Sequence, residues 1–329
     1  MSILNLKNKN VLIFCPSFFG YDTEIKKEIE TLGATVSLFD ERVFSNIFGK
    51  ALIRLNFRRG IKYYIEKFYT KNLLNQVKAI DYILLINPET ITTNILQRVK
   101  EINPNVKIIT YMWDSFKNKT FSKEYIKLSD SFFTFDPVDA KENKVDFLPL
   151  FFVDDYQNVK EKVEFKYTFS FIGTAHSERF NIVKNLTRSS TSNFLFFYCP
   201  SQIVYLYKKY IKSELNGLNV SDISFSSMNR QNIINVIESS RSIIDVCHPS
   251  QVGLTMRSIE MLGAKKKLIT TNIEILSYDF YHSNNILYVN DETTSEQINR
   301  FIELPYYAVC DDIYNKYCIS NWIKRLFHE

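Results

Sequence analysis

The chain has 329 residues, of which 45% are hydrophobic and 23% are charged. This length and composition suit two globular domains of about 150 residues each and exclude a small disulfide-stapled scaffold, a fibrous protein and a disordered tail. The net charge is +5, but from Arg42 to Lys78 nine basic residues stand against one acidic residue, a local charge of +8. An anionic partner is therefore expected at this basic segment rather than over the whole surface.

The cysteines and the apolar runs indicate the compartment. The five cysteines are odd in number and widely spaced, which predicts free thiols in a reducing compartment. No run reaches the roughly 18 apolar residues that a membrane-spanning helix needs. We expect a cytoplasmic protein, with peripheral attachment at the inner face of the plasma membrane as a further possibility.

In the first half, short apolar runs alternate with helical patterns. Residues 10–15 predict a buried strand, and Asp22 is placed to cap a helix that Gly33 ends. Further strands are predicted at residues 34–39, 81–86, 106–111, 131–135 and 146–150, with a helix at residues 92–102. Alternation of this kind predicts a doubly wound parallel sheet.

A polar stretch from Asp154 to Lys166 predicts a linker, and a second alternating set follows it. Its strands are predicted at residues 167–172, 194–198, 223–225, 242–246, 267–270 and 286–289, and its helices from Ser177 and at residues 203–211, 230–239 and 255–262. The expected fold class is α/β, with two Rossmann-like doubly wound domains and a cleft between them. The domains are placed at residues 1–155 and 156–310, and the tail at residues 311–329, helical over 313–327, is expected to pack back on the first domain.

Ligands of doubly wound sheets bind beyond the carboxyl ends of the strands, so the loops there are the first places to search. The loop from Gly173 and Thr174 through His176 to Arg179 joins a strand to a helix start, where backbone N–H groups favour a phosphate. His176 and Arg179 would add charge. An ordinary strand-to-helix turn explains the same residues, because a lone glycine is no fingerprint.

The stretch from Asp245 to Ala264 is more informative. It leads from a strand through a loop with Pro249 and Gly253 into a helix near Thr255. Arg257 and Glu260 are three residues apart and share one helical face. They form either a surface ion pair or a nucleotide site, in which Glu260 accepts from sugar hydroxyls and Arg257 binds a phosphate.

This stretch resembles the donor-binding half of bacterial glycosyltransferases of the GT-B fold, most closely those that build capsule, O-antigen or lipooligosaccharide chains. The resemblance is carried by residues 251–260 (QVGLTMRSIE), followed by Gly263 and residues 267–272 (KLITTN). The same motif continues at residues 278–281 (YDFY) and 285–286 (NI), and residues 170–173 (SFIG) and 317–322 (YCISNW) are also similar. The matches in the first half, at residues 111–115 (YMWDS) and 134–137 (TFDP), are weaker.

The resemblance implies a nucleotide-sugar donor held against the second domain, with Glu260 on the ribose and Gly173, Thr174 and Arg257 at the diphosphate. The candidate donor-binding residues are Gly173, Thr174, His176, Arg179, His248, Gln251, Gly253, Thr255, Arg257 and Glu260. The pair His248-Pro249 is similar to a His-Pro pair of some CMP-sugar transferases. The residue eight before Glu260 is Val252 rather than the glutamate of retaining enzymes, so an inverting and a retaining outcome both stay open.

An inverting enzyme needs a base to deprotonate the acceptor hydroxyl. Asp114 directly follows a strand beside Trp113, where partial desolvation suits this role, and Asp22 is the rival. Asp136 before Pro137 is more typical of an Asx turn. No cofactor is expected, and no metal, because the chain has no Asp-x-Asp pair and its four histidines lack ligand spacing.

Residues 48–71 mix aromatic and aliphatic residues with Arg and Lys, as in one or two basic amphipathic helices separated near Gly60. This is either a core helix with a solvated basic face or a surface for anionic lipid, carried by Arg54, Arg58, Arg59 and Lys62. No nucleic-acid partner is expected.

We therefore expect a metal-independent transferase that moves a sugar from a nucleotide-sugar to a surface polysaccharide, a lipooligosaccharide or another lipid-linked glycan. A GT-B nucleotide-sugar epimerase and a non-catalytic glycan- or nucleotide-binding relative are the alternatives.

Overall fold

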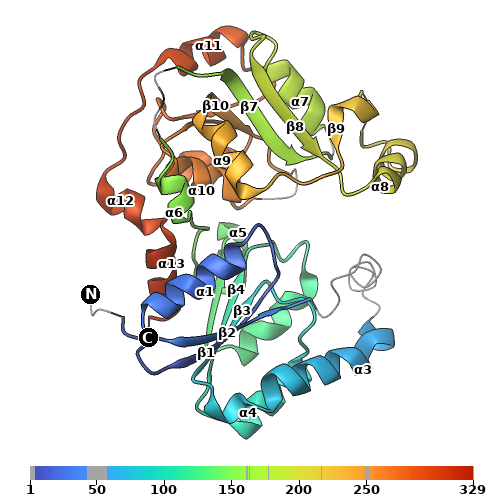
Figure 1. Cartoon of the computed structure of the whole chain (residues 1–329), viewed down its shortest axis with the longest axis vertical. Helices are drawn as coiled ribbons and strands as arrows, with labels where there is room; N and C mark the ends of the chain where they lie inside the picture. Colours follow the sequence, from blue (N-terminus) through green and yellow to red (C-terminus); the bar gives the residue numbers. More distant parts are fainter. Residues whose placement is uncertain are drawn as a thin grey trace. The chain divides into compact units, whose positions relative to one another are not determined.

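The computed structural model describes residues 4–42, 58–160, 162, 164–176, 178–215, 217–248 and 252–328 (Figure 1). The chain divides into two compact units. Unit 1 comprises Met1–Leu150 together with Ile319–Glu329, and unit 2 comprises Phe151–Cys318.

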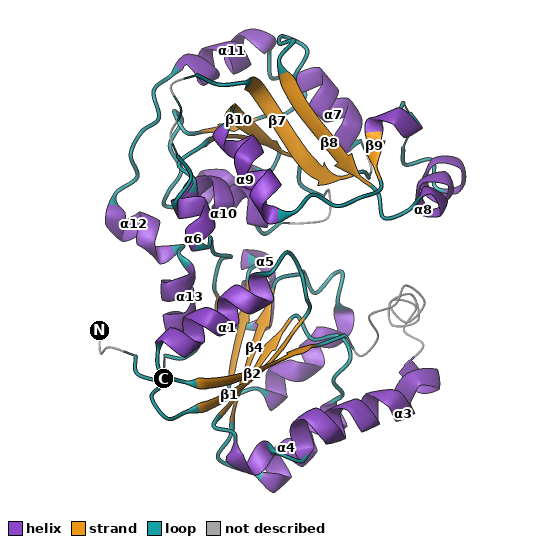
Figure 2. Cartoon of the chain, viewed as in Figure 1, coloured by secondary structure: helices purple, strands orange, loops and turns teal. Residues whose placement is uncertain are grey.

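Unit 1 is built on a six-stranded sheet in the order β2-β1-β3-β4-β5-β6, in which every paired neighbour is parallel (Figure 2). Its strands are β1 (Asn10–Cys15), β2 (Thr35–Asp40), β3 (Tyr82–Ile86), β4 (Lys107–Met112), β5 (Ser131–Thr134) and β6 (Asp146–Phe147). The continuous apolar runs of β1 and β3 follow from burial of both faces of the sheet.

The helices of unit 1 are α1 (Tyr21–Thr31), α3 (Arg58–Tyr69), α4 (Thr93–Ile102), α5 (Pro137–Asn143) and α13 (Ile319–Leu326). A π-helical turn at Thr70–Leu74 and 3-10 turns at Val77–Ala79 and Thr120–Leu128 join them. Helix α4 shows how the sequence directs packing. The Thr92 side chain caps it by accepting from the Ile95 N–H, and Ile95, Leu96 and Val99 make its buried face.

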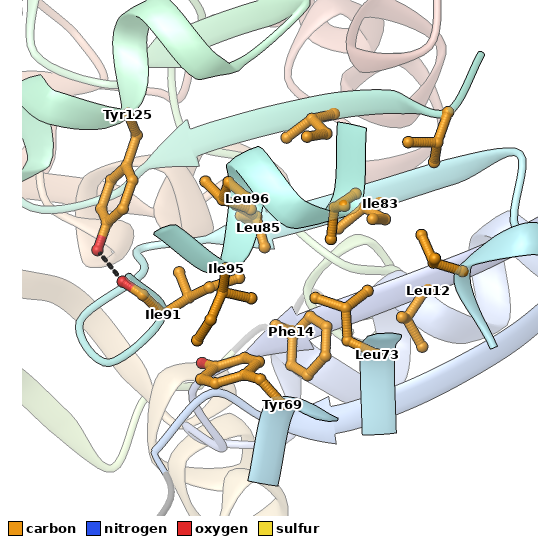
Figure 3. Close-up of a cluster of buried hydrophobic side chains, with 14 of the residues drawn as sticks. Leu12, Phe14, Tyr69, Leu73, Ile83, Leu85, Ile91, Ile95, Leu96 and Tyr125 are labelled. Carbon is orange, nitrogen blue, oxygen red and sulfur yellow. Dashed lines mark hydrogen bonds between the residues drawn. The ribbon is translucent and has the colours of Figure 1, made fainter. Parts of the chain in front are cut away.

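One hydrophobic cluster of unit 1 lies between one face of the sheet and α3, α4 and the turns around them. Figure 3 shows Leu12 and Phe14 of β1 and Leu85 of β3 among the side chains of this cluster. Tyr125 closes it on one side, where its hydroxyl donates to the Ile91 carbonyl at 2.7 Å.

Unit 2 contains a second six-stranded sheet in the order β12-β11-β10-β7-β8-β9, again with parallel neighbours. Its strands are β7 (Tyr167–Thr174), β8 (Asn193–Tyr198), β9 (Ile223–Ser224), β10 (Ser240–Asp245), β11 (Lys267–Thr270) and β12 (Ile286–Tyr288). Counted along the unit, this is the Rossmann order 3-2-1-4-5-6.

The helices of unit 2 are α6 (Asp154–Gln157), α7 (Arg179–Leu186), α8 (Gln202–Leu206), α9 (Arg230–Glu238), α10 (Met256–Gly263), α11 (Ser295–Glu303) and α12 (Asp311–Lys316). A π-helical turn at Tyr207–Ile211 continues α8, and 3-10 turns lie at Val220–Asp222 and Ile273–Ser277.

Two expectations about elements are wrong. The tail is not one helix over residues 313–327: α12 ends at Lys316 in unit 2, and α13 begins at Ile319 in unit 1. The expected linker begins instead as α6, in which Tyr156 is 2% exposed and is buried in unit 2. Gly60 lies inside α3, which begins at Arg58, and residues 48–57 lie outside the described part of the chain, so the separation expected near Gly60 stays a prediction.

Asp22 does not cap α1 as the sequence suggested. The helix begins at Tyr21, and its N-cap is Gly20 in the left-handed conformation, with φ of 74°. Asp22 therefore lies in the first turn, where its charge complements the positive end of the helix dipole.

Among the residues that the structure describes, no helix is long and apolar enough to cross a membrane.

Candidate functional site in unit 2

The topology of unit 2 concentrates two loops at one edge of its sheet. Strands β7 and β10 are parallel neighbours, and the connections leave them in opposite directions, toward β8 and β11. A doubly wound sheet binds its ligand at this switch point, beyond the carboxyl ends of the two strands. The loops that follow β7 and β10 contain the donor-binding residues predicted from the sequence.

Gly173 lies inside β7, paired with Phe197, and is not the turn residue that the sequence suggested. A Cβ atom at this position would lie 2.7 Å from Cζ of Phe171. The Phe171 ring is buried and packs on the Phe197 ring at 4.9 Å between centroids, so it has little room to move. Packing within the strand thus requires the glycine, and Thr174 ends the strand as an exposed residue.

Arg179, the first residue of α7, joins the two loops. Its guanidinium donates to the Thr174 carbonyl at 3.1 Å, after β7, and to the Val246 carbonyl, after β10. Burial lowers the pKa of Arg179, while the nearby Asp245 opposes that shift. In the structure Arg179 therefore holds the loops together.

His176 and His248 also meet across the two loops, with ring centroids 5.1 Å apart. Burial, aided by the charge of Arg179, lowers the pKa of His176 to about 3. The imidazole is neutral at neutral pH as a result, and it can donate one hydrogen bond without adding charge.

Helix α10 is fastened to the end of β10 by a residue to which the sequence reasoning gave no role. Asp245, the last residue of β10, accepts from the hydroxyls of Thr255 at 2.6 Å and Ser258 at 3.0 Å. Thr255 is also the N-cap of α10, because its hydroxyl accepts from the Ser258 N–H at 3.2 Å. Asp245 could have been found from its place at the end of a predicted strand, ten residues before a capping threonine.

The predicted pair of Arg257 and Glu260 is present on α10, with 2.7 Å between Nη1 and Oε2. It is not a surface pair, because the two side chains are only 15% and 6% exposed. Because the pair is so far removed from water, solvent and salt screen the attraction between its two charges less than in an exposed pair. The first turns of α10 therefore present a fixed carboxylate and guanidinium next to the switch point.

Asn272 supports the loop before α10. Its side-chain amide donates to the Val252 carbonyl at 3.0 Å and to the Gly253 carbonyl at 3.4 Å, and its carbonyl oxygen accepts from the Glu274 N–H. The structure therefore brings Gly253 to the same edge of the sheet. Gln251 lies outside the described residues.

In unit 1 the two predicted bases have different surroundings. Asp114 follows β4, and its Oδ1 accepts from the Ser115 N–H and the Asn118 amide, both at 2.9 Å. In Asp22 the Oδ1 atom is buried and has no hydrogen-bond partner among the described residues. Asp136 caps α5 by accepting from the N–H groups of Val138 and Asp139, which is the local role that the sequence favoured.

Unit 1 also contains a buried carboxyl group that the sequence reasoning missed. Glu41 follows β2 and is completely buried. Its Oε1 accepts from the N–H groups of Glu89 at 2.7 Å, Thr90 and Ile91 at 3.2 Å, in the loop after β3. Burial raises the pKa of Glu41 to about 7, although these hydrogen bonds oppose the shift. No local pattern could reveal this, because the bonded residues are 48 to 50 positions apart in the chain.

The described part of the basic segment packs one face of α3 into unit 1. Ile65 and Tyr69 are buried in the core, whereas Lys62 and Tyr63 are exposed. Arg54 and the side chains of Arg58 and Arg59 lie outside what the structure describes.

Across the described residues, no group of three or more His, Cys, Asp and Glu side chains is arranged to hold a metal ion.

Comparison with known proteins supports the architecture. No family model and no curated protein matches the chain. Among solved structures, AviGT4, a glycosyltransferase involved in avilamycin A biosynthesis, matches with a TM-score of 0.58 at 8% identity, over 96% of this chain and 95% of that chain. Anabaena Alr3699/HepE matches with a TM-score of 0.53 at 10% identity, both in complex with UDP-glucose, over 96% and 94% of the two chains, and in complex with UDP, over 97% and 94%.

These matches span nearly the whole chain and include both sheets. The protein has a two-domain α/β fold of the GT-B type, as expected from its sequence.

Proposed function

We propose that the protein is a glycosyltransferase that moves a sugar from a nucleotide-sugar to a surface polysaccharide or lipooligosaccharide acceptor. The observation that carries this proposal is the buried Arg257–Glu260 pair on α10, next to the switch point between β7 and β10. A fixed carboxylate suits the two hydroxyls of a ribose, and the capped start of α10 suits a diphosphate. The fold shared with AviGT4, a glycosyltransferase, and with HepE, which binds UDP-glucose, supports it further.

In this proposal each loop contributes one part of the donor site. Glu260 binds the ribose, and Arg257 with the backbone of Gly173, Thr174 and Gly253 binds the diphosphate. Arg179 fixes the distance between the loops through its two carbonyl contacts. His176, His248, Gln251 and Thr255 complete the site.

A thermal-shift screen against UDP, GDP, CMP and dTDP tests the donor site. We expect one nucleotide, with UDP as the first candidate, to raise the melting temperature. Glu260→Gln should weaken its binding about ten- to hundredfold, because a hydrogen bond to a charged group is lost.

The matched control is Glu303→Gln. Glu303 also pairs with an arginine, Arg241 at 2.6 Å, but Arg241 lies at the amino end of β10, opposite the candidate site. Equal loss of nucleotide binding in both variants, or binding of no nucleotide by the wild type, would contradict the donor site.

For the acceptor we propose a surface or lipid-linked glycan, reached in the cytoplasm at the inner face of the membrane. Transfer predicts that free nucleotide is released from the donor only when acceptor glycan is supplied. Conversion of the nucleotide-sugar into its epimer without acceptor, and without net release of free nucleotide, would instead identify an epimerase. Binding of nucleotide without any turnover would identify a non-catalytic relative.

We propose Asp114 as the base if the reaction inverts, with Asp22 as the alternative. Asp114→Asn keeps an acceptor oxygen for Ser115 and Asn118 but cannot take up a proton, so it should abolish turnover and leave nucleotide binding unchanged. Activity that survives in Asp114→Asn and is lost in Asp22→Asn would assign the role to Asp22.

We also propose that transfer requires no metal ion. Treatment with EDTA should then leave the rate unchanged. A loss of rate that Mn²⁺ restores would contradict this.

A further inference from the structure

The helical segment after β8 exposes apolar side chains where a surface helix is ordinarily polar. Helix α8 and the π-helical turn that continues it cover Gln202 to Ile211. Five large side chains on this segment form the outward stripe, and each of them is at least 49% exposed: Ile203, Leu206, Tyr207, Tyr210 and Ile211.

The spacing of the outward stripe is that of one helix face. Its members recur at intervals of three and four residues, so they lie along one side of the helix. The opposite side is anchored in unit 2: Tyr205 is 2% exposed, and its hydroxyl donates to the Leu218 carbonyl at 3.1 Å. The stripe is therefore held outward by packing on the other face.

Single exposed apolar residues are normal, but a row of them marks an interaction surface. Ile203, Ile211 and Tyr210 are 79%, 71% and 69% exposed. In Figure 1 the α8 segment stands at the margin of unit 2, beyond the edge strand β9.

Within the helical segment itself, all the charges have one sign. Residues 202–212 contain Lys208, Lys209 and Lys212 and no acidic residue. Lys208 donates to the Ala175 carbonyl at 2.9 Å and Lys209 to the Leu218 carbonyl at 2.8 Å, so both ammonium groups are held beside the helix. Lys212 is exposed at its end.

We propose that residues 202–212 form a docking helix that lies in the plane of an anionic lipid bilayer, with the outward stripe inserted among the lipids. Tyrosines prefer the membrane interface, and lysines flanking an apolar face attract anionic headgroups. A protein partner fits less well, since a stable interface buries about 800 Å² on each side. This helix is only about 15 Å long.

This surface belongs to unit 2, whereas the basic segment at residues 48–71 belongs to unit 1. It also does not depend on the proposed transfer reaction, because vesicle binding is measured without donor or acceptor.

Co-sedimentation of the full chain with vesicles tests the proposal. We expect binding to vesicles of phosphatidylcholine with phosphatidylglycerol, and weaker binding to phosphatidylcholine alone. Ile203→Ser/Ile211→Ser should lower the partition coefficient about tenfold or more, because two apolar side chains no longer leave water. Lys212→Glu should lower it for the anionic vesicles only.

The matched control is Ile273→Ser/Leu276→Ser. These residues are also exposed apolar side chains of unit 2, 56% and 44% exposed, but they lie on the 3-10 turn at Ile273–Ser277. The control should bind vesicles like the wild type. Circular dichroism and melting temperatures establish that Ile203→Ser/Ile211→Ser and Ile273→Ser/Leu276→Ser are both folded.

A second measurement uses Tyr210→Trp. The wild type, which contains only Trp113 and Trp322, provides the background emission. The additional emission from the new indole at position 210 should shift to shorter wavelength on anionic vesicles and should be quenched by brominated lipid.

Three outcomes would overturn the proposal. The first is equal sedimentation of the wild type and Ile203→Ser/Ile211→Ser. The second is loss of binding only in Arg58→Ala/Arg59→Ala/Lys62→Ala, which would assign membrane binding to the basic segment. The third is a dimer that the stripe variant dissociates while no vesicle binds, which would assign the stripe to a second copy of the chain.

Discussion

At the scale of single residues, two positions depend on contacts that the local sequence does not reveal. Glu41 receives three backbone N–H groups from a loop nearly fifty residues away, and Gly173 makes room for the ring of Phe171. Each can be tested by one substitution, which removes the ionisable group at position 41 or adds a methyl group at position 173.

Glu41→Gln should change how the stability of unit 1 depends on pH. The pKa of Glu41 is raised from its ordinary 4.5 to about 7 in the folded protein, so the folded state favours the proton. The protonated Glu41 side chain therefore stabilises the folded state at low pH. This stabilisation is lost as the pH rises through the pKa that Glu41 has in the folded protein, and the free energy of unfolding falls by up to about 3 kcal/mol. Glutamine keeps the acceptor Oε1 and cannot ionise.

The difference in free energy of unfolding between wild type and Glu41→Gln should therefore move in favour of the variant between pH 5 and pH 8. Urea unfolding followed by tryptophan fluorescence measures this, because both tryptophans, Trp113 and Trp322, belong to unit 1. A difference that stays constant over this range would mean that Glu41 is ionised throughout.

Gly173→Ala should destabilise unit 2 by about 1–3 kcal/mol, since the new methyl group overlaps a buried ring. Phe171→Leu removes the overlapping atom, so the double variant should lose less stability than the two single losses predict. Denaturation followed by circular dichroism gives the free energy of unfolding of the wild type, the two single variants and the double variant, which together form a double-mutant cycle. Simple additivity of the two substitutions would contradict the packing explanation.

At the scale of elements, α10 owes its position to its cap. Thr255 both caps the helix and donates to Asp245 at the end of β10, so one side chain fixes where the helix starts and how it meets the sheet. Helix α11 offers a comparison, because Thr294 caps it in a capping box with Gln297.

Thr255→Ala and Thr294→Ala should each cost about 1 kcal/mol of stability through the lost cap. Only Thr255→Ala should also weaken nucleotide binding, because it frees the helix that presents Arg257 and Glu260. Titration calorimetry with the nucleotide found in the screen, alongside melting temperatures, separates the two effects. Similar nucleotide affinities in both variants would show that the Asp245 contact does not position α10.

Most elements were predictable at this scale. Apolar runs and capping residues predict β1, β3, α4 and α10 within one or two residues, because burial and capping act locally. Helices α5 and α11 were not predicted, although Asp136-Pro137 and the Thr294–Gln297 capping box are start signals. Gly60 lies inside α3, where the packing of Ile65 and Tyr69 offsets the low helix propensity of one glycine.

At the scale of the whole molecule, the chain returns to unit 1 at its end. Helix α13 contributes Trp322, which is 1% exposed and meets the Tyr111 ring edge-on at 4.8 Å between centroids. Phe327 packs on Tyr82 at 5.2 Å in the same unit. Residues beyond Cys318 are therefore part of the core of unit 1.

Trp322→Ala should destabilise unit 1 by about 3–5 kcal/mol, while Trp322→Phe should cost clearly less because it retains the ring contact. The fluorescence of Trp113 follows unit 1 in both variants, and thermal shift with nucleotide follows the donor site in unit 2. An unchanged unfolding transition of unit 1 in Trp322→Ala would contradict the assignment of α13 to that unit.

The sequence by itself determined the α/β class, the two alternating sets of strands and the loops in which to search for a nucleotide. These follow from hydrophobic periodicity and from the rule that parallel sheets bind ligands beyond their carboxyl ends. Only the tertiary structure decided that Arg257 and Glu260 are buried together, that Asp245 and Asn272 hold their surroundings, and that Glu41 is enclosed. The reason is physical: burial and long-range hydrogen bonds depend on which distant segments meet, and no local pattern of residues encodes that meeting.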